Sequence, residues 1–322
     1  MKKCLLVIVI LPTLSYAQLK WKNVDSIFGA LQSSIHVYFN NDSLDKRPNI
    51  AYYAEIDLKD KSLDITVDTT LNRRLTPTQY FEKDNHPLLV VNCTFFEFIH
   101  NSNLNVVMKD GKLLAYNNET ISGKGKDTLI YQHVFGSAIG IDRKRNADVA
   151  WLLTDSAKSI AYASQTPIKA IKDSSAKHDF NFYYNYSNFS KWKMQTAVGG
   201  GPVLLQNGEI KITNNEELKF AGKAINDKHP RTSMGYTKDG KLIIMVIEGR
   251  FPNKAEGATL EQEAKMLKDI GCIEALNLDG GGSSCMLING KQTITPSDKE
   301  GQRPVPAVFI IQSKNKLLNI PN

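Results

Sequence analysis

The chain has 322 residues, of which 42% are hydrophobic and 23% charged, and its formal net charge is +7 at pH 7. This composition is typical of a globular protein with one large or two ordinary domains, and it excludes a disordered or fibrous chain. The basic residues are spread along the sequence without a block of like charges, so nucleic-acid binding is not indicated. An anionic small molecule or polymer remains a candidate partner.

The N-terminus has the organisation of a secretory signal peptide. Lys2 and Lys3 precede an apolar run at residues 4–14, and residues 15–17 form a small-x-small cleavage site. The apolar run is shorter than the about 20 residues that span a bilayer. We therefore expect cleavage after Ala17 and a secreted or periplasmic protein without a membrane span.

Cysteine and histidine spacings predict no metal site. Cys93, Cys272 and Cys285 remain in the expected mature chain, and their spacings match neither a disulfide framework nor a zinc motif. One pair among them can still form a disulfide in an oxidising compartment. The six histidines lie far apart in the sequence, without ligand spacing. We therefore expect no metal and no cofactor, and the oligomeric state stays open.

Alternating apolar residues predict a protein built mostly of strands. Residues 24–31 and 34–39 indicate a short helix and a strand. Residues 49–67 alternate on both sides of a polar turn at 59–61, which predicts an antiparallel hairpin with one wet face. Short apolar runs such as residues 88–91 continue the pattern and indicate buried strands.

The clearest helix begins at Thr259, where Gln262 completes a capping box, and ends at Gly271. Residues 304–311 read as a closing strand. The elements together predict an α+β fold with a largely antiparallel or mixed β-sheet core, few helices and Gly-rich loops at strand ends.

The domain organisation follows from the absence of a Pro/Ser-rich linker after the signal peptide. We expect a signal peptide at residues 1–17, an N-terminal extension at 18–48 and one domain at 49–322.

Residues 177–192 concentrate aromatic side chains among Asn, Ser and Lys without a clean period. Aromatic rings in a polar loop offer apolar faces on which sugars stack. The same composition suits a loop that closes the edge of a core, and the sequence does not separate these two interpretations.

Two stretches place three consecutive glycines between strand-like runs. Residues 199–201 precede the turn Asn207-Gly208, and residues 280–282 follow Asp279. Each glycine in regular structure destabilises it by roughly 0.5–1 kcal/mol relative to alanine, so a simple turn does not need three. The stretches are either glycine-rich hairpins with a turn aspartate or two backbone cradles around one ligand, with N–H groups that bind phosphate.

An ordered set of motifs resembles the phosphodiester glycosidase family. The motifs are Gly-Gly-Gly-Pro at 199–202, Arg-Thr at 231–232, Glu-Gly-Arg at 248–250, Asn-Leu-Asp-Gly-Gly-Gly-Ser-Ser at 277–284 and Arg-Pro-Val-Pro at 303–306. They cover the chain from about residue 92 to residue 311. The resemblance implies a hydrolase that removes a sugar from a sugar-1-phosphodiester, and links the chain to exopolysaccharide or another envelope carbohydrate.

Two departures from the family pattern bear on the substrate. The family's first signature has two glycines and an aspartate, where this chain has Cys93, Thr94 and Glu97. The acid before Gly249 is often aspartate in the family and is Glu248 here. The negative charge is kept, but the longer side chain reaches further, so the substrate can differ.

The chemistry of C1–O cleavage assigns roles to the charged residues. The transition state has oxocarbenium character and needs a carboxylate near the anomeric carbon. Asp279 is the first candidate and Glu248 the second. Arg231 and Arg250 are expected to hold the phosphate, and His229 to supply a proton. The resemblance also implies that substrate binding involves Asn92, Gly200, Gly201, Asn277, Gly280, Gly281, Gly282 and Ser283.

Two other functions are compatible with the sequence. One is a metal-assisted phosphodiesterase, which needs clustered His and Asp ligands that the spacing does not provide. The other is a non-catalytic envelope protein that binds glycans through residues 177–192 and uses its glycine loops only to fold.

Overall fold

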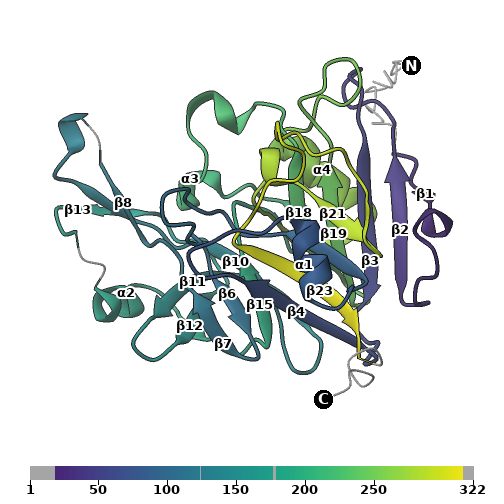
Figure 1. Cartoon of the computed structure of the whole chain (residues 1–322). Coiled ribbons are helices and arrows are strands. Elements are labelled where there is room, and N and C mark those ends of the chain that lie inside the picture. The colour runs from purple at the N-terminus through teal and green to yellow at the C-terminus, as the bar shows by residue number, and fades with distance from the viewer. Residues whose placement is uncertain (1–18, 124, 177–178, 315–322) are drawn as a thin grey trace, which may run out of the picture.

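A computed structural model describes residues 19–123, 125–176 and 179–314. The expected signal peptide lies outside the described residues. The strands form four sheets in which every pairing between the named strands of the described chain is antiparallel, and the helices are few and short (Figure 1). The predicted α+β class is confirmed. No helix in the described part of the chain is long and apolar enough to cross a membrane.

Two large sheets contain most of the strands. The eight-stranded sheet has the order β1-β2-β3-β19-β18-β20-β16-β17, and the seven-stranded sheet the order β14-β12-β11-β10-β15-β6-β7. The bounds in the first are β1 (Lys22–Asn23), β2 (Ile35–Asn40), β3 (Ala51–Asp57), β16 (Val203–Gln206), β17 (Glu209–Ile210), β18 (Arg231–Thr237), β19 (Lys241–Ile247) and β20 (Cys272–Asn277). Those in the second are β6 (Val107–Lys109), β7 (Lys112–Ala115), β10 (Ser137–Ile141), β11 (Ala147–Asp155), β12 (Ile160–Ser164), β14 (Ser190–Lys191) and β15 (Thr196–Gly199).

A five-stranded and a three-stranded sheet complete the fold, in the orders β22-β21-β5-β23-β4 and β13-β9-β8. Their strands are β4 (Leu63–Thr69), β5 (Leu89–Asn92), β21 (Met286–Ile288), β22 (Lys291–Gln292), β23 (Ala307–Ser313), β8 (Thr120–Ser122), β9 (Tyr131–His133) and β13 (Ile171–Asp173). The α-helices are α1 (Pro77–Lys83), α2 (Phe180–Tyr186), α3 (Asn214–Glu217) and α4 (Leu260–Ile270). The 3-10 turns are η1 (Asp25–Phe28), η2 (Gly125–Asp127), η3 (Gly222–Ile225) and η4 (Gly281–Ser283).

The core is layered, and β19 shows why its sequence is apolar throughout. Leu242, Ile244 and Val246 face the main core between the sheets. The alternate residues Ile243 and Met245 face a second core formed with α4. Because successive side chains of a strand point to opposite faces, a strand covered on both sides loses the alternation of apolar and polar residues.

Helix α4 confirms the predicted boundaries. The Thr259 hydroxyl accepts a hydrogen bond from Gln262 N, the Gln262 side chain accepts one from Thr259 N, and Gly271 ends the helix with a φ of 103°. The Asn-Gly turns at 207–208 and 289–290 also connect paired strands, as predicted. Local signals identify these elements because their hydrogen bonds close within a few residues.

Two local predictions were wrong, the hairpin of β3 with β4 and the loop at residues 180–186. β3 and β4 were expected to form one hairpin, but β3 pairs with β2 and β19, whereas β4 pairs with β23. Residues 180–186 form the short helix α2 instead of a loop. Of the two alternatives for the glycine-rich stretch after β20, the structure excludes the hairpin, because β20 and the following β21 belong to different sheets.

An N-terminal extension was expected at residues 18–48, and its described part, residues 19–48, contributes β1 and β2 to the edge of the eight-stranded sheet (Figure 1). Ile35 and Val37 of β2 are buried in the main core.

Candidate functional site

Residues 279–284 carry the chain from the eight-stranded to the five-stranded sheet. β18 runs antiparallel to both β19 and β20, so the start of β18 lies beside the ends of its two neighbours. This brings Arg231, Glu248 and Asp279 to one edge of the sheet, although they lie far apart in the sequence.

Asn92, at the end of β5, ties the two sheets together beneath this loop. It is fully buried. Its Nδ2 donates to the carbonyl oxygen of Asp279 at 2.6 Å, and its Oδ1 accepts from the Thr232 hydroxyl at 2.9 Å and from Cys285 N at 3.1 Å. These bonds use both ends of the amide, so Asn92 fixes the position of the loop.

A pocket of about 200 Å³ lies on this loop. It is lined by Phe95, Phe220, Ala224, His229, Arg231, Arg250, Asp279, Gly280 and Gly281. Six of the sequence-predicted site residues therefore meet in one cavity around a single carboxylate: Asp279, His229, Arg231, Arg250, Gly280 and Gly281.

The carboxyl group of Asp279 is held in a partly desolvated place. Burial raises the pKa of Asp279 to about 7. A hydrogen bond with the Ser283 side chain, the positive charge of Arg303 and the N–H of Gly280 all favour the carboxylate but only partly offset the burial. A carboxyl group with a pKa near neutrality is suited to acid–base or nucleophilic chemistry.

Arg231 is a rigid cation in the pocket wall. Only 2% of its surface is exposed. Its Nε donates to Ala258 O at 2.9 Å and its Nη2 to Asp227 O at 3.2 Å. Behind it, burial raises the pKa of Glu263 on α4 to about 7, although the Arg231 charge opposes this shift. Burial lowers the pKa of Arg231 from its ordinary value, but a guanidinium stays charged at neutral pH.

Arg250 and His229 complete the polar lining. Arg250 is exposed and has a φ of 68°, and its guanidinium lies close to Gly281. Burial, followed by the charges of Arg231 and Arg250, lowers the pKa of His229. The imidazole is therefore neutral at pH 7, and a neutral imidazole with one N–H can donate a hydrogen bond to a phosphate oxygen.

Glu248 does not line this pocket. Its Oε2 accepts from Thr295 N at 2.7 Å and its Oε1 lies 2.9 Å from Lys254 Nζ. The residue is 3% exposed. The contacts of Glu248 anchor the segment around Thr295 instead of joining Asp279 in the cavity.

The first glycine loop, residues 199–201, uses its N–H groups within the fold. Gly199 N, Gly200 N and Gly201 N donate to carbonyl oxygens of Val106, Ser137 and Asn277. A Cβ on Gly200 would lie 2.4 Å from Asn277 O, so glycine is required for two backbones to approach each other. Asn277 returns the contact, donating from Nδ2 to Gly201 O at 2.9 Å. Gly200, Gly201 and Asn277 are therefore bonded within the fold and are not among the residues that line the pocket.

The second glycine loop is divided between the pocket and the fold. Gly280 and Gly281 line the cavity. Gly281 N donates to Pro230 O at 2.8 Å, and a Cβ on Gly282 would overlap the Arg303 guanidinium. Ser283 is buried and accepts a hydrogen bond of 3.4 Å from Arg303 Nη1.

Sequence reasoning missed Arg303 as a member of the site. Its Nε and Nη2 each lie 2.7 Å from Asp298 Oδ2, which directs the guanidinium towards Ser283. The signal was present in the Arg-Pro-Val-Pro motif. The aromatic walls, Phe95 and Phe220, carried no such signal, because isolated phenylalanines are most often core residues.

Metal and disulfide chemistry also depend on the tertiary structure. No group of three His, Cys, Asp or Glu side chains in the described segments is close enough to hold a metal ion. Cys93, Cys272 and Cys285 are buried free thiols.

Comparison with known proteins identifies a family. The family model "Phosphodiester glycosidase" matches residues 85–312. N-acetylglucosamine-1-phosphodiester alpha-N-acetylglucosaminidase from human is 32% identical over 103 residues, which are 30% of this chain and 20% of the human protein. The mouse enzyme is 30% identical over 103 residues, with the same coverage. The matched segment thus spans about a fifth of these relatives.

Solved structures support the fold. The catalytic domain of zebrafish N-acetylglucosamine-1-phosphodiester alpha-N-acetylglucosaminidase superposes with a TM-score of 0.60 at 20% identity, covering 92% of this chain and 89% of that one. A hypothetical protein from Synechocystis superposes with a TM-score of 0.65 at 12% identity, covering 92% of this chain and 64% of that one. At these identities the similarity concerns the fold alone.

Proposed function

Because the chain belongs to the phosphodiester glycosidase family, we propose that it hydrolyses the bond between a sugar's anomeric carbon and the phosphate of a sugar-1-phosphodiester. The observation that carries this proposal is one carboxyl group, Asp279, in a pocket with the guanidinium groups of Arg231 and Arg250. One carboxylate and two cations match a substrate that develops positive charge on the sugar and carries negative charge on the phosphate.

The site residues fall into two groups, one that binds the phosphate and one that acts on the sugar. Arg231, held by two backbone carbonyls, and Arg250 bind the phosphate oxygens and stabilise the phosphomonoester as it leaves. Neutral His229 donates a hydrogen bond to the same group. A phosphate is a fair leaving group, so this electrostatic stabilisation replaces a strong general acid.

Asp279 acts in its deprotonated form. The carboxylate has one of three roles: it stabilises the oxocarbenium-like sugar, attacks the anomeric carbon as a nucleophile, or acts as the base for water. The hydrogen bond with Ser283 and the positive charge of Arg303 stabilise the carboxylate form of Asp279. Glu248, bonded to Lys254 and Thr295 N, serves to position the loop at 295 and takes no part in bond cleavage.

The substrate belongs to the envelope or to an extracellular glycan in this proposal, and the protein is secreted or periplasmic after cleavage at Ala17. The reaction is metal-independent and uses no cofactor. Activity that survives exhaustive dialysis against a chelator is the expected result, and its loss and recovery with added metal would support the phosphodiesterase alternative.

The decisive experiment is a panel of sugar-1-phosphodiesters with product identification. We expect free sugar and a phosphomonoester of the aglycone. Sugar-1-phosphate as the product would contradict the proposal, because it reports P–O cleavage. Variant Glu248→Gln serves as the matched carboxylate control, and we expect it to turn over the same substrates.

One observation favours a second function, glycan binding without catalysis. Helix α2 exposes Phe182, Tyr184 and Tyr186, with exposed fractions of 55%, 38% and 57%. Exposed aromatic rings are platforms for sugars. Saturable glycan binding that Phe182→Ala abolishes, together with no turnover across the whole panel, would establish this function instead.

A further inference from the structure

The strands that support the proposed site at one end border a second cavity at the other. β10 runs from Ser137, whose carbonyl accepts from Gly200 N, to Ile141. At about 3.3 Å per residue, these ends lie about 13 Å apart. The second cavity, of about 200 Å³, is lined by Asp64, Ile65, Asp110, Ile141, Asp142, Arg143, Arg145, Gln195 and Thr196.

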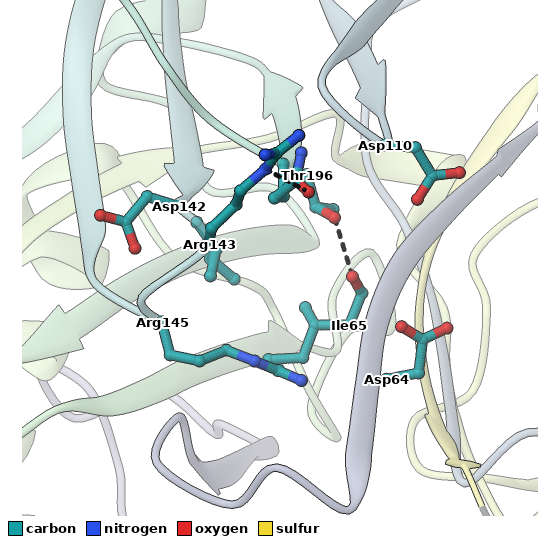
Figure 2. A pocket seen from close by; sticks show the side chains of 9 residues that line it. Asp64, Ile65, Asp110, Asp142, Arg143, Arg145 and Thr196 are labelled. Carbon is teal, nitrogen blue, oxygen red and sulfur yellow. Dashed lines mark hydrogen bonds between the residues drawn. The ribbon is translucent and has the colours of Figure 1, made fainter.

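Opposite charges face each other across this cavity. Figure 2 shows Arg143 and Arg145, from the turn between β10 and β11, on one side, and Asp64 of β4 and Asp110 of the β6–β7 turn on the other. Asp142 points away from the cavity (Figure 2). Its carboxylate accepts from Lys144 N, Asn146 N and Asn146 Nδ2 within its own turn, so it is not available to a ligand.

Arg145 has an unsatisfied donor at this cavity. Its Nη2 donates to Leu63 O, whereas its Nη1 is buried and has no hydrogen-bond partner within the described chain. The backbone φ of Arg145 is 69°, in the left-handed region that residues other than glycine rarely adopt. A buried guanidinium N–H without an acceptor is costly, and an oxyanion supplies the acceptor that the fold does not.

The neighbouring groups add further donors and acceptors. Arg143 Nε donates to Gln195 Oε1 at 3.1 Å, which holds the side chain at the cavity and leaves its terminal nitrogens for a ligand. Asp64 Oδ2 accepts from Gln312 at 2.8 Å and has a second oxygen. No hydrogen bond to the Asp110 carboxylate is found in the described segments, so it is open to a ligand hydroxyl.

We propose that this cavity is a second binding site, which takes an anionic sugar with its oxyanion between Arg143 and Arg145 and its hydroxyl groups on Asp64 and Asp110. The two carboxylates would repel a simple inorganic anion, and a neutral sugar would leave the Arg145 donor unsatisfied. A sugar bearing a carboxylate, phosphate or sulfate satisfies both sides. We assign this cavity a binding role and no hydrolytic role, because its two carboxylates lie opposite two arginines.

This inference goes beyond the proposed hydrolysis and does not depend on it. A site for an acidic sugar separate from the catalytic pocket would hold an acidic glycan against the enzyme. Binding at this cavity is measurable whether or not the enzyme cleaves any phosphodiester.

The test is calorimetric titration of the mature protein with glucuronate, glucose and inorganic phosphate. We expect glucuronate to bind more tightly than either of the others. Arg143→Gln and Asp110→Asn should each weaken glucuronate binding by roughly tenfold or more, because each removes a charge-assisted hydrogen bond. Asparagine tolerates the left-handed backbone at position 110, where φ is 52°, so the second variant keeps the turn.

The matched control is Lys144→Gln, which removes one positive charge from the same turn without touching the cavity lining, and which should bind glucuronate as the parent does. Asp279→Asn should also bind it normally, which locates the ligand away from the catalytic pocket. The proposal is overturned if glucuronate does not bind at millimolar concentration, if Arg143→Gln binds it unchanged while melting normally, or if phosphate alone binds equally well.

Discussion

The two triple-glycine loops have the same local sequence pattern, a strand followed by three glycines, yet each lies beside a carboxyl group in a different environment. Next to residues 199–201, Glu217 accepts hydrogen bonds from Ser137 N and Oγ, Trp151 Nε1, Val203 N and Thr213 Oγ1. Next to residues 280–282, Asp279 opens on a pocket and burial raises its pKa to about 7. Five donors satisfy the first carboxylate, so it stabilises the fold, whereas the second keeps its capacity to react.

The comparison also separates the two reasons for glycine. In the first loop the backbones of Gly200 and Asn277 touch, and no N–H of residues 199–201 is left for a ligand. In the second loop the glycines allow Arg250 and Arg303 to approach the chain from two sides. In both loops glycine is required because other atoms of the protein lie close to the loop backbone, and not because the substrate does.

The largest expected effect is the loss of activity in Asp279→Asn. If Asp279 is the carboxylate at the anomeric carbon, this variant should lose roughly a thousandfold or more in kcat. Turnover of a sugar-1-phosphodiester and thermal melting are the measurements. Retention of most activity in a folded protein would remove Asp279 from the mechanism.

Glu217→Ala should instead lose stability. It leaves five buried donors without an acceptor, which should lower the free energy of unfolding by roughly 3–5 kcal/mol. Denaturant unfolding measures this, and Glu248→Gln provides a comparison with a carboxyl that has fewer partners. Specific activity per folded molecule should change far less than in Asp279→Asn. If Glu217→Ala and Asp279→Asn lost specific activity equally, the contrast between structural and reactive carboxylates would fail.

Alanine at one glycine of each loop should have opposite signatures. Gly200→Ala places a Cβ against backbone, 2.4 Å from Asn277 O, and should destabilise the protein by roughly 1–3 kcal/mol. In Gly281→Ala the Cβ meets the flexible end of Arg250, and the main strain is its φ of 62°. We expect that variant to melt closer to the parent and to raise KM by displacing Arg250. Equal melting temperatures with unchanged KM would show that the loops are equivalent.

The smallest expected effects depend on pH. Because the pKa of Asp279 is about 7 in the folded protein and 3.8 for an unperturbed aspartate, the folded protein binds more protons than the unfolded chain between these values. Ionising Asp279 therefore costs stability as pH rises from about 4 to about 7, and the cost is complete above that range. Asp279→Asn should stabilise the protein at pH 8 by roughly 1–2 kcal/mol and by less at pH 5, measured by thermal melting.

The same protonation sets the direction of the activity profile. If the carboxylate is the active form, kcat/KM should rise with pH and level off above about 7, since a phosphodiester keeps one negative charge throughout. A profile that falls with pH through this range would assign Asp279 the role of a general acid.

Sequence reasoning identified those parts of the fold and site that depend on neighbouring residues. Thr259 and Gln262 define the start of α4 because their hydrogen bonds span three residues. It also selected Asp279, Arg231, Arg250 and His229, which the structure places in one pocket. It could not find Phe95 or Phe220, whose role depends only on which other elements pack beside them.

What the sequence by itself determined is the main strands, the Asn-Gly turns, the capped helix α4, the three-glycine loops and the charged groups at strand ends, because these follow from local backbone preferences. Only the tertiary structure decided that β3 and β4 lie in different sheets and that residues 279–284 cross between sheets instead of closing a hairpin. It also decided that Glu248 faces Lys254 while Asp279 faces the pocket. Those outcomes depend on which distant strands bury each other's apolar faces, and local spacing carries no information about that choice.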